Sequence, residues 1–444
     1  MSAAGQSGVC GGVRGEVLRV AVSVAPSRQV TSGDRLRGGV TESSVAASRD
    51  GASSDGGSQR LVLAVVAGGN FTQLGARFLL PPVVPLVITE FDASESTVGL
   101  ALTLLWGTYA LFQFPSGVLA DRYGERRLLL AGLLGTVVGT AAIALAPSLV
   151  AYGLFAVLLG AGAGMFFSPA SSLLSRTFTN SGQALGALTA GGALAGVVYP
   201  AVGGYLGETF GWRVAVAVGA AVALPAALAT AGLLPRVEPA NPERRLTAAV
   251  DRGRLFELVS RPSVAYTTVL AIVVSFTFQS FTSLFPTFLI QYRAGIDTTT
   301  AGLLFGAVFG LSSLAQPVAG RVSDTFTRDL AIAASVVLTG LGFLLLLFLP
   351  GRVGLVTGAI TLGAGISWPG PVQARFMDQF SDEERGYGFG LVRTTYMFAA
   401  APGSVIVGTL AERVGWVAAY GTVVGLLALA LTVLLVNAVF RLDL

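Results

Sequence analysis

The sequence predicts an all-α polytopic membrane protein with twelve transmembrane helices, arranged as two parallel six-helix repeats. Three observations support this prediction. The composition is strongly apolar, hydrophobic runs of bilayer-spanning length recur along most of the chain, and a loop motif in the first half returns in the second half. Together they indicate a membrane protein built from two related halves.

The composition excludes an ordinary soluble domain. Of the 444 residues, 53% are hydrophobic and 12% are charged, and the mean hydropathy is +0.73. A soluble domain carries about 25% charged residues, so this chain has too little polar surface to face water on all sides. We therefore expect membrane lipid as its surroundings.

Missing residue types and motifs exclude several kinds of chemistry. The chain has no histidine, which rules out His-based catalytic triads, His metal ligands and His proton relays. The single cysteine, Cys10, can form no internal disulfide, and no CxxC or Cys/His cluster offers a metal site. The chain also lacks a P-loop, a GxSxG and a DxD motif, so we expect neither an enzyme nor a cofactor. A net charge of +4, thinly spread, does not indicate a nucleic-acid partner.

Twelve apolar runs of about 20 residues follow a polar tail. Residues 1–59 are rich in Gly, Ser, Ala and Arg without a helical or strand period, and we expect a disordered cytoplasmic tail, with a downstream start site as the open alternative. The spans are expected at 61–85, 97–119, 128–147, 149–174, 184–207, 213–234, 263–290, 300–322, 330–349, 353–376, 387–411 and 416–438.

The spans divide into six and six. An N-terminal bundle, 60–235, and a C-terminal bundle, 263–444, are expected to be joined by a cytoplasmic central loop, 236–262. We expect a surface helix or linker between residues 243 and 258 of this loop, whose arginines suit anionic lipid headgroups.

Three loop motifs recur in order in the two halves. Gln113, Gly117 and Asp121 return 203 positions later, and the stretches around Gly99 and Gly204 return after 203 and 204 positions; their counterparts are Gln316, Gly320, Asp324, Gly302 and Gly408. An even number of helices in each half makes the repeats parallel, related by an axis along the membrane normal.

The arginines indicate the orientation. With the N-terminus inside, the inner loops and ends hold sixteen arginines, and the outer loops hold only Arg213, Arg293, Arg352 and Arg413. Because basic residues favour the cytoplasmic side, we expect both termini and the central loop in the cytoplasm, in a multi-pass protein of the plasma membrane.

The loop from Gly117 to Arg126 reads GVLADRYGER and resembles the signature loop GxLaDrxGrk of the major facilitator superfamily of secondary transporters. Residues 320–328 resemble its degenerate counterpart between helices 8 and 9. Glu125 departs from the pattern, since the family usually has a basic residue there. The resemblance covers residue 60 to the end and implies alternating access of two six-helix bundles and an inner gate formed by Gly117, Asp121, Arg122, Gly124, Arg126, Gly320, Asp324 and Arg393.

The residues of the first loop also have a physical reading of their own. Gly117 has no side chain and lets its helix approach a neighbour closely. Asp121 lies at an inner helix end, where it can meet the positive N-terminus of the helix that starts near Gly386, with Arg393 as a charge partner. The simpler alternative is a solvated loop with positive-inside arginines.

Helix 5 carries a second resemblance. The stretch 196–204 resembles the family's antiporter motif GPxxGG, with Tyr199 in place of a usual glycine. Pro200 removes one helix hydrogen bond, and Gly203 and Gly204 allow close packing, so we expect a kinked interface helix. Antiport and plain packing both remain open. In helix 4, Ala156 occupies the position where antiporters of the family usually carry an arginine.

Arg77 is the charge that the first span places in hydrocarbon. Such an arginine costs at least about 2.5–3.5 kcal/mol on insertion scales, so it should face a partner or a wet cavity. Asn70, Gln73 and Arg77 share one helical face. An arginine binds a carboxylate or phosphate through two parallel hydrogen bonds. The sequence of residues 108–115, together with Arg77, resembles the organic-anion branch of the superfamily. The alternative is that Arg77 snorkels or pairs structurally.

Three further residues are candidates for substrate binding. They are Gln279 in helix 7, Trp368 in helix 10 and Tyr396 in helix 11, although aromatic residues in apolar helices more often pack than bind ligand. The sequence from Trp368 to Pro371 holds two prolines within a span, which predicts a broken helix.

The sequence therefore predicts a monomeric transporter of a small organic solute, and it favours organic anions through Arg77. Drug-type proton-coupled efflux is the alternative, and a non-transporting membrane sensor on the same fold is a third reading. No Asp or Glu lies in the middle of a predicted span. A coupling proton, a coupling sodium ion and uncoupled diffusion all stay open.

Overall fold

The computed structural model describes residues 43–243, 252–381 and 384–442. Residues 1–53 and 54–444 form two separate units, and the second unit carries the features below. Its described part is helical, with twelve stretches long and apolar enough to cross a membrane. They span Gln59–Phe91, Glu95–Tyr123, Glu125–Ala144, Leu149–Thr177, Ser181–Phe210, Trp212–Leu233, Pro262–Tyr292, Thr298–Thr325, Arg328–Phe348, Gly351–Gln379, Tyr387–Val414 and Trp416–Phe440.

The helices of the described residues confirm the expected all-α fold. They are α1 (Ser43–Phe78), α2 (Leu80–Phe91), α3 (Glu95–Tyr123), α4 (Glu125–Ala144), α5 (Leu149–Gly164), α6 (Phe167–Thr177), α7 (Ser181–Phe210), α8 (Trp212–Leu233), α9 (Arg252–Ser260), α10 (Pro262–Tyr292), α11 (Thr298–Thr325), α12 (Arg328–Phe348), α13 (Gly351–Gly365), α14 (Pro369–Gln379), α15 (Arg385–Ala400), α16 (Gly403–Val414) and α17 (Trp416–Phe440).

Caps and single glycines set the helix ends. Ser94 and Ser148 accept hydrogen bonds from the backbone N–H three residues on, as helix N-caps do. Gly124, Gly211 and Gly415 have φ of 91°, 89° and 100°, a left-handed conformation that a side chain disfavours. Each of these glycines joins two spans through a single residue.

Four spans consist of two helices each. The interruptions fall between α1 and α2, α5 and α6, α13 and α14, and α15 and α16. The break before Pro369 confirms the broken tenth span that the two prolines predict, because proline supplies no N–H to continue the helix. By contrast, Pro115, Pro200 and Pro286 lie inside continuous helices.

The first helix, α1, starts ahead of the first expected span. The helix begins at Ser43, within the stretch expected to be a tail. Extending an existing helix adds one hydrogen bond per residue and avoids the cost of nucleation. The rest of that tail, 1–42, lies outside the described residues. In the central loop α9 forms the expected surface helix from Arg252, and residues 244–251 are also outside the described part.

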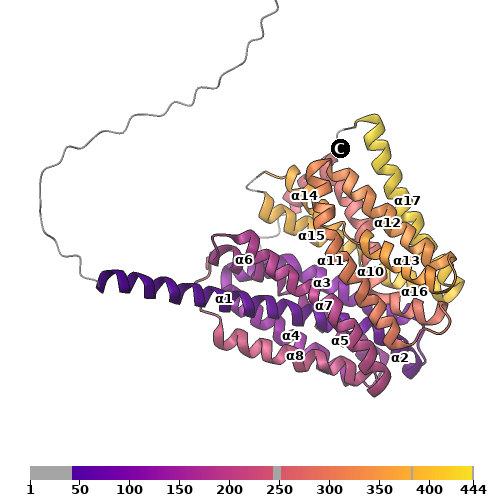
Figure 1. Cartoon of the computed structure of the whole chain (residues 1–444), viewed down its shortest axis with the longest axis horizontal. Helices are drawn as coiled ribbons and strands as arrows, with labels where there is room; N and C mark the ends of the chain where they lie inside the picture. Colours follow the sequence, from indigo (N-terminus) through magenta and orange to yellow (C-terminus); the bar gives the residue numbers. More distant parts are fainter. Residues whose placement is uncertain (1–42, 244–251, 382–383, 443–444) are drawn as a thin grey trace, which may run out of the picture. The chain divides into compact units, whose positions relative to one another are not determined.

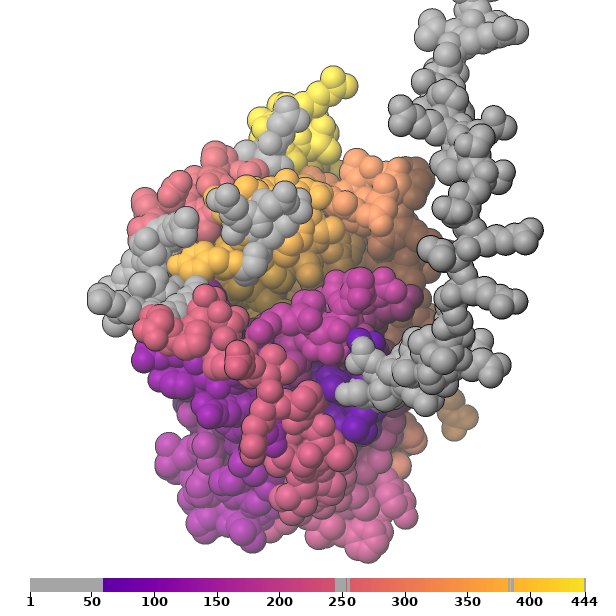
Figure 2. Space-filling view, turned by 90° about the vertical axis from the view of Figure 1, so that its left-hand side faces the viewer, coloured from indigo at the N-terminus to yellow at the C-terminus, as the bar shows by residue number. Residues whose placement is uncertain are grey.

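The first six and the last six spans form two groups of helices, which we call the N-terminal half and the C-terminal half (Figure 1). In Figure 2 the two halves, indigo to magenta and orange to yellow, meet along a common boundary. Across it α7 packs along α11, and α3 packs along α15 and α16. We call the end that carries Asp121 and Asp324 the motif end, and the end that carries Trp212 and Trp416 the Trp end.

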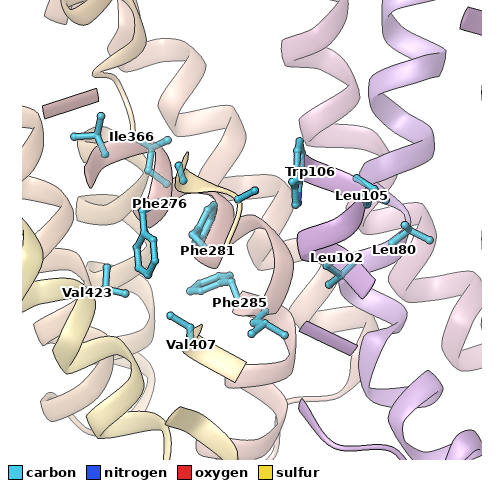
Figure 3. Close-up of a cluster of buried hydrophobic side chains, with 14 of the residues drawn as sticks. Leu80, Leu102, Leu105, Trp106, Phe276, Phe281, Phe285, Ile366, Val407 and Val423 are labelled. Atoms are coloured by element: carbon cyan, nitrogen blue, oxygen red, sulfur yellow. The ribbon is translucent and has the colours of Figure 1, made fainter. Parts of the chain in front are cut away.

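One buried apolar cluster joins the halves. Leu102, Leu105 and Trp106 of α3 belong to the same cluster as Phe281 and Phe285 of α10 (Figure 3). Aromatic rings in this cluster contact one another edge to face, as with Phe281 and Phe305 at 5.3 Å between centroids. In lipid such packing holds helices together through van der Waals contact rather than through exclusion of water.

An ion pair joins the start of α10 to the start of α15. Arg261 donates two hydrogen bonds to the Glu384 carboxylate, at 3.0 and 2.7 Å, and the Ser381 N–H donates a third at 3.2 Å. The Arg261 guanidinium is the main reason that the pKa of Glu384 falls to about 2, and the carboxylate in turn raises the pKa of Arg261.

This pair predicts a pH dependence with a definite sign. An unperturbed glutamate has a pKa of about 4.3, so the pair should stabilise the fold fully above that pH and lose its effect as the pH falls towards 2. We expect the difference in melting temperature between wild type and Glu384→Gln to be smaller at pH 3 than at pH 6, and to vanish only below about pH 2. A difference that stays constant over this range would contradict the assignment.

Candidate transport site and gates

A cavity of about 590 Å³ lies between the halves at the motif end. The N-terminal half contributes α3, α6 and the start of α7, and the C-terminal half contributes α14 and α15. Its walls consist of Gln113, Phe114, Gly117, Val118, Asp121, Phe167, Ser168, Ser171, Ser172, Ser175, Leu185, Leu188, Thr189, Gln373, Tyr387, Phe389, Gly390 and Arg393. A cavity of this size, lined by both halves, accommodates a small organic molecule.

Hydroxyl and amide groups line the N-terminal side of this cavity. Ser168, Ser171 and Ser172 follow one face of α6, and their hydroxyls donate to the Gln113 carbonyl, the Phe167 carbonyl and the Glu125 carboxylate. The side-chain nitrogen of Gln113 is buried and has no partner. The sequence indicates Phe167 and Ser168 of this wall as cavity residues, and sequence reasoning missed Ser171 and Ser172, although the serine spacing along α6 is a visible signal for them.

Arg393 contributes a positive charge from the C-terminal side. Its guanidinium lies over the ring of Phe167 in the other half, 4.9 Å from the centroid. Asp121 and Gly117 line the same cavity, so the structure brings the expected inner-gate residues of α3 and α15 to one space. Arg393 therefore faces the place where a ligand would sit between the halves.

Arg77 anchors a buried chain of polar side chains. It donates to the Gln73 side-chain oxygen at 3.1 Å, Gln73 donates to Asn70 at 2.7 Å, and Asn70 donates to the Leu188 carbonyl of α7 at 2.8 Å. All three side chains are buried. The stripe that the sequence predicts on one helix face thus forms one hydrogen-bonded chain.

The Arg77 guanidinium lies between aromatic rings and is incompletely bonded. Its carbon lies 4.0 Å from the Tyr109 ring centroid and 5.1 Å from that of Trp106. With 2% of the residue exposed, its Nε and one terminal nitrogen have no hydrogen-bond partner. Unpartnered buried donors of this kind are costly unless a ligand or water completes them.

The remaining candidates lie in the C-terminal half and pack more closely. Gln279 donates to the Met397 carbonyl at 3.0 Å, and its oxygen has no partner. Trp368 contacts the ring of Phe278, and Tyr396 stacks on Phe376 with 3° between the ring planes. Neither these three residues nor Asn70, Gln73 and Arg77 belong to the walls of the cavity.

The motif loop is held by backbone contacts. The Asp121 carbonyl accepts a hydrogen bond from Asn241 N–H at 2.8 Å, and Arg126 donates to the carbonyls of Thr230 and Ala231 at the end of α8. The guanidinium of Arg122 lies 5.4 Å from the Tyr123 ring. In the second half, Arg328 pairs with Asp324 and Asp378. The contacts of Asp121 and Arg126 hold the motif loop of the first half beside the cavity, and those of Arg328 hold its counterpart in the second half.

The structure gives the departure at Glu125 a physical reason. This residue starts α4 with its side chain fully buried, and it accepts from Arg176 of α6 at 2.7 Å. The second half repeats the arrangement at equivalent positions, where Arg375 of α14 pairs with Asp329 at the start of α12. A negative charge also suits a helix N-terminus. Each half therefore ties its third span to its fourth through a carboxylate and an arginine.

The glycines of the two ends differ in how tightly the opposite half abuts them. A Cβ added to Gly117 would lie 3.6 Å from Ser168, and one added to Gly320 would meet nothing within 4 Å. At the Trp end a Cβ on Gly204 would lie 2.6 Å from the Thr298 carbonyl, and one on Gly99 2.7 Å from the Ser404 carbonyl. The halves are therefore closely packed at the Trp end and separated by a cavity at the motif end.

The helix-5 motif takes part in this close packing. Gly203 faces Leu79, at the break between α1 and α2, and Gly204 faces the start of α11. Pro200 lies within α7, and its carbonyl abuts Gly302 of α11. The motif thus belongs to the packed surface between the halves.

Comparison with known proteins agrees with this architecture. The sequence profile described as Major Facilitator Superfamily matches residues 66–297 and 270–442, which together cover most of the chain. The chain belongs to the major facilitator superfamily. Its fold, with twelve spans in two parallel repeats, is the fold of that superfamily, whose members are transporters and not enzymes.

Two curated relatives come from Bacillus subtilis (strain 168). An uncharacterized MFS-type transporter, YceJ, is 28% identical over 282 residues, covering 62% of this chain and 69% of the relative. Multidrug resistance protein 1 is 24% identical over 370 residues, covering 80% of this chain and 91% of the relative. These superfamily members share the transporter architecture with this chain.

Solved superfamily structures match over most of the length. A bacterial homolog of the human lysosomal transporter Spinster, in an inward-facing and occupied conformation, has a TM-score of 0.70 at 16% identity, covering 85% of this chain and 96% of that one. The human organic anion transporter MFSD10 has a TM-score of 0.63 at 18% identity, covering 85% and 99%. At these identities the likeness establishes the fold alone.

Proposed function

We propose that this superfamily member carries a small organic anion across the plasma membrane by alternating access of its two halves. The proposal takes both termini as cytoplasmic, as the arginine distribution predicts, so the cavity at the motif end is open to the cytoplasm. It treats the described structure as the inward-facing state.

The observation that carries the proposal is the incompletely bonded Arg77. Its guanidinium is buried among aromatic rings, with two nitrogens that have no partner. A second arginine, Arg393, faces the cavity from the other half. Arg77 lies outside the cavity walls in the described state. A ligand carboxylate or phosphate that reaches its unpartnered nitrogens supplies the charge-assisted hydrogen bonds that they lack.

Other groups of the cavity fit a polar organic anion. The side-chain nitrogen of Gln113 can donate a hydrogen bond, and the α6 hydroxyls can accept from substrate hydroxyls. Among the curated relatives, a hexuronate transporter of Bacillus subtilis is 22% identical over 294 residues, and its name refers to an organic anion. The site residues Asn70 and Gln73 act in this proposal by holding Arg77 in place.

A substrate panel in proteoliposomes tests the proposal. We expect uptake of one or more carboxylates or organic phosphates by the wild type. Arg77→Ala should lower kcat/KM for that anion roughly 10- to 150-fold, because it removes charged hydrogen bonds worth about 1.5–3 kcal/mol. Arg77→Lys should fall between, since lysine keeps the charge without the planar fork.

The same assay has its own controls. Arg352→Ala changes an exposed arginine at the Trp end and should leave uptake unchanged. Running the panel with and without a pH gradient, and with and without sodium, identifies the coupling ion. Anion uptake that survives Arg77→Ala at the wild-type rate would contradict the proposed role.

Drug-type efflux is the second candidate, and two observations favour it. Relatives include Multi-drug resistance efflux pump PmrA of Streptococcus pneumoniae serotype 4 (strain ATCC BAA-334 / TIGR4), 26% identical over 269 residues. In the C-terminal half, the ring of Phe309 contacts those of Phe278 and Phe281 at 6.1 and 6.0 Å between centroids, and such rings offer aromatic contacts to aromatic drugs. This function predicts export of cationic dyes that Arg77→Ala leaves intact.

A further inference from the structure

Two carboxylates at the Trp end bind helix N-termini of the opposite half. Glu208, in the last turn of α7, accepts hydrogen bonds through one oxygen from the N–H and the hydroxyl of Thr299, at 2.8 and 2.6 Å. Glu412, in the last turn of α16, accepts from the N–H of Ser96 at 3.3 Å. The first contact links the N-terminal half to α11, and the second links the C-terminal half to α3.

The two contacts satisfy the same backbone group in each helix. The first N–H groups of a helix have no partner inside the helix. In α11 the N-cap Asp297 binds the third of these N–H groups, that of Thr300, and Glu208 binds the second.

In α3 the N-cap Ser94 likewise binds the N–H of Thr97, and Glu412 binds that of Ser96. Each cap is thus shared between a residue of the helix itself and a carboxylate from the other half. A carboxylate at this place also interacts favourably with the positive end of the helix dipole.

A glycine one turn before each carboxylate permits the approach. Gly204 precedes Glu208 by four residues, and Gly408 precedes Glu412 by four, so each pair shares a helix face. A Cβ on Gly204 would lie 2.6 Å from the Thr298 carbonyl, and a Cβ on Gly408 would lie 2.5 Å from that of Glu95. The two carbonyls belong to the first residues of α11 and α3.

We propose that Glu208 and Glu412 form a matched pair of cross-half caps that hold the Trp end closed. The inference rests on the proposed alternating access, and it goes beyond it by assigning the residues that set the balance between the two states. When the halves separate at the Trp end, α11 and α3 lose the carboxylates from their first turns. The internal repeat places one such carboxylate in each half. Separation of the halves at the Trp end therefore breaks both caps together.

Distance measurements between spin labels test the proposal independently of substrate. Labels are introduced by cysteine substitution in a Cys10→Ser background at Pro147, on an exposed loop of the N-terminal half, and at Arg352, which is exposed in the first turn of α13. Both positions lie at the Trp end. Glu208→Gln and Glu412→Gln keep the side-chain shape and remove the charge. We expect each to raise the ratio of the longer to the shorter label distance roughly two- to five-fold. The double variant should show the product of the two fold-changes, because the two free energies add.

Glu90→Gln is the matched control. Glu90 also lies at the Trp end, but it pairs with Arg213 and Trp212 of its own half, so this variant should leave the distance distribution unchanged. An unchanged distribution in the Glu208→Gln/Glu412→Gln variant, or an equal shift with Glu90→Gln, would overturn the proposal. If the double variant shifts the label distances as expected but the wild type transports no anion, only the proposed function is contradicted.

Discussion

Gly204→Val is expected to shift the protein away from the state with a closed Trp end. The added side chain would meet the Thr298 carbonyl, and its first carbon would already lie 2.6 Å from that oxygen. Backbone cannot move aside as a flexible side chain does, so α7 and α11 must separate. Overpacking of this kind costs about 1–3 kcal/mol, which corresponds to a roughly 5- to 150-fold change in the ratio of the two states.

The measurement is the accessibility of a cysteine placed at the half-buried Ile296, just before the N-cap of α11, to a membrane-impermeant thiol reagent in a Cys10→Ser background. Labelling should be faster in Gly204→Val than in the parent. Gly186→Val is the control on the same helix, because a Cβ at Gly186 meets nothing within 4 Å. If both valine variants label at the parent rate, close packing at Gly204 does not hold this end closed.

Arg176→Ala is expected to destabilise the fold strongly. It removes the partner of the fully buried Glu125 and leaves a carboxylate with little else to compensate its charge. Removing one member of a fully buried pair costs about 3–5 kcal/mol. Because 38% of the Arg176 side chain is exposed and water can replace part of its effect, we expect about 2–3 kcal/mol.

Unfolding by SDS in mixed micelles, followed by circular dichroism, gives this difference in the free energy of unfolding. Adding Glu125→Gln to Arg176→Ala should recover more than half of the loss, since the unpaired charge is then gone. Glu257→Ala removes a widely exposed pair at 3.9 Å and should cost less than about 1 kcal/mol. Equal losses in Arg176→Ala with and without Glu125→Gln would show that the charge pairing is not the cause.

The different glycine environments of the two ends connect these predictions. Gly117 and Gly320, which the family resemblance assigns to the inner gate, have room for a side chain in the described state, whereas Gly204 and Gly302 do not. Under the proposed alternating access, Gly117 would need its close approach only when the motif end closes. A substitution at Gly117 would therefore affect the state with a closed motif end, whereas the described structure has this end open.

The sequence by itself determined the features that depend on local composition and periodicity. Apolar runs of bilayer length defined twelve spans, the recurrence of Gly117 and Asp121 as Gly320 and Asp324 defined two parallel halves, and two prolines after Trp368 defined a broken span. The polar stripe of Arg77 was visible for the same reason, because residues three and four apart share one face of a helix.

Only the tertiary structure decided which of those faces meet. Periodicity identifies a face of one helix but not the helix that packs against it, and contacts such as Glu208 with Thr299 join residues from different halves. The role of Glu125 depended on Arg176, a partner in another span. The walls of the cavity depended further on which end of the two halves is closed, and that balance is set by packing across the interface, which no local pattern records.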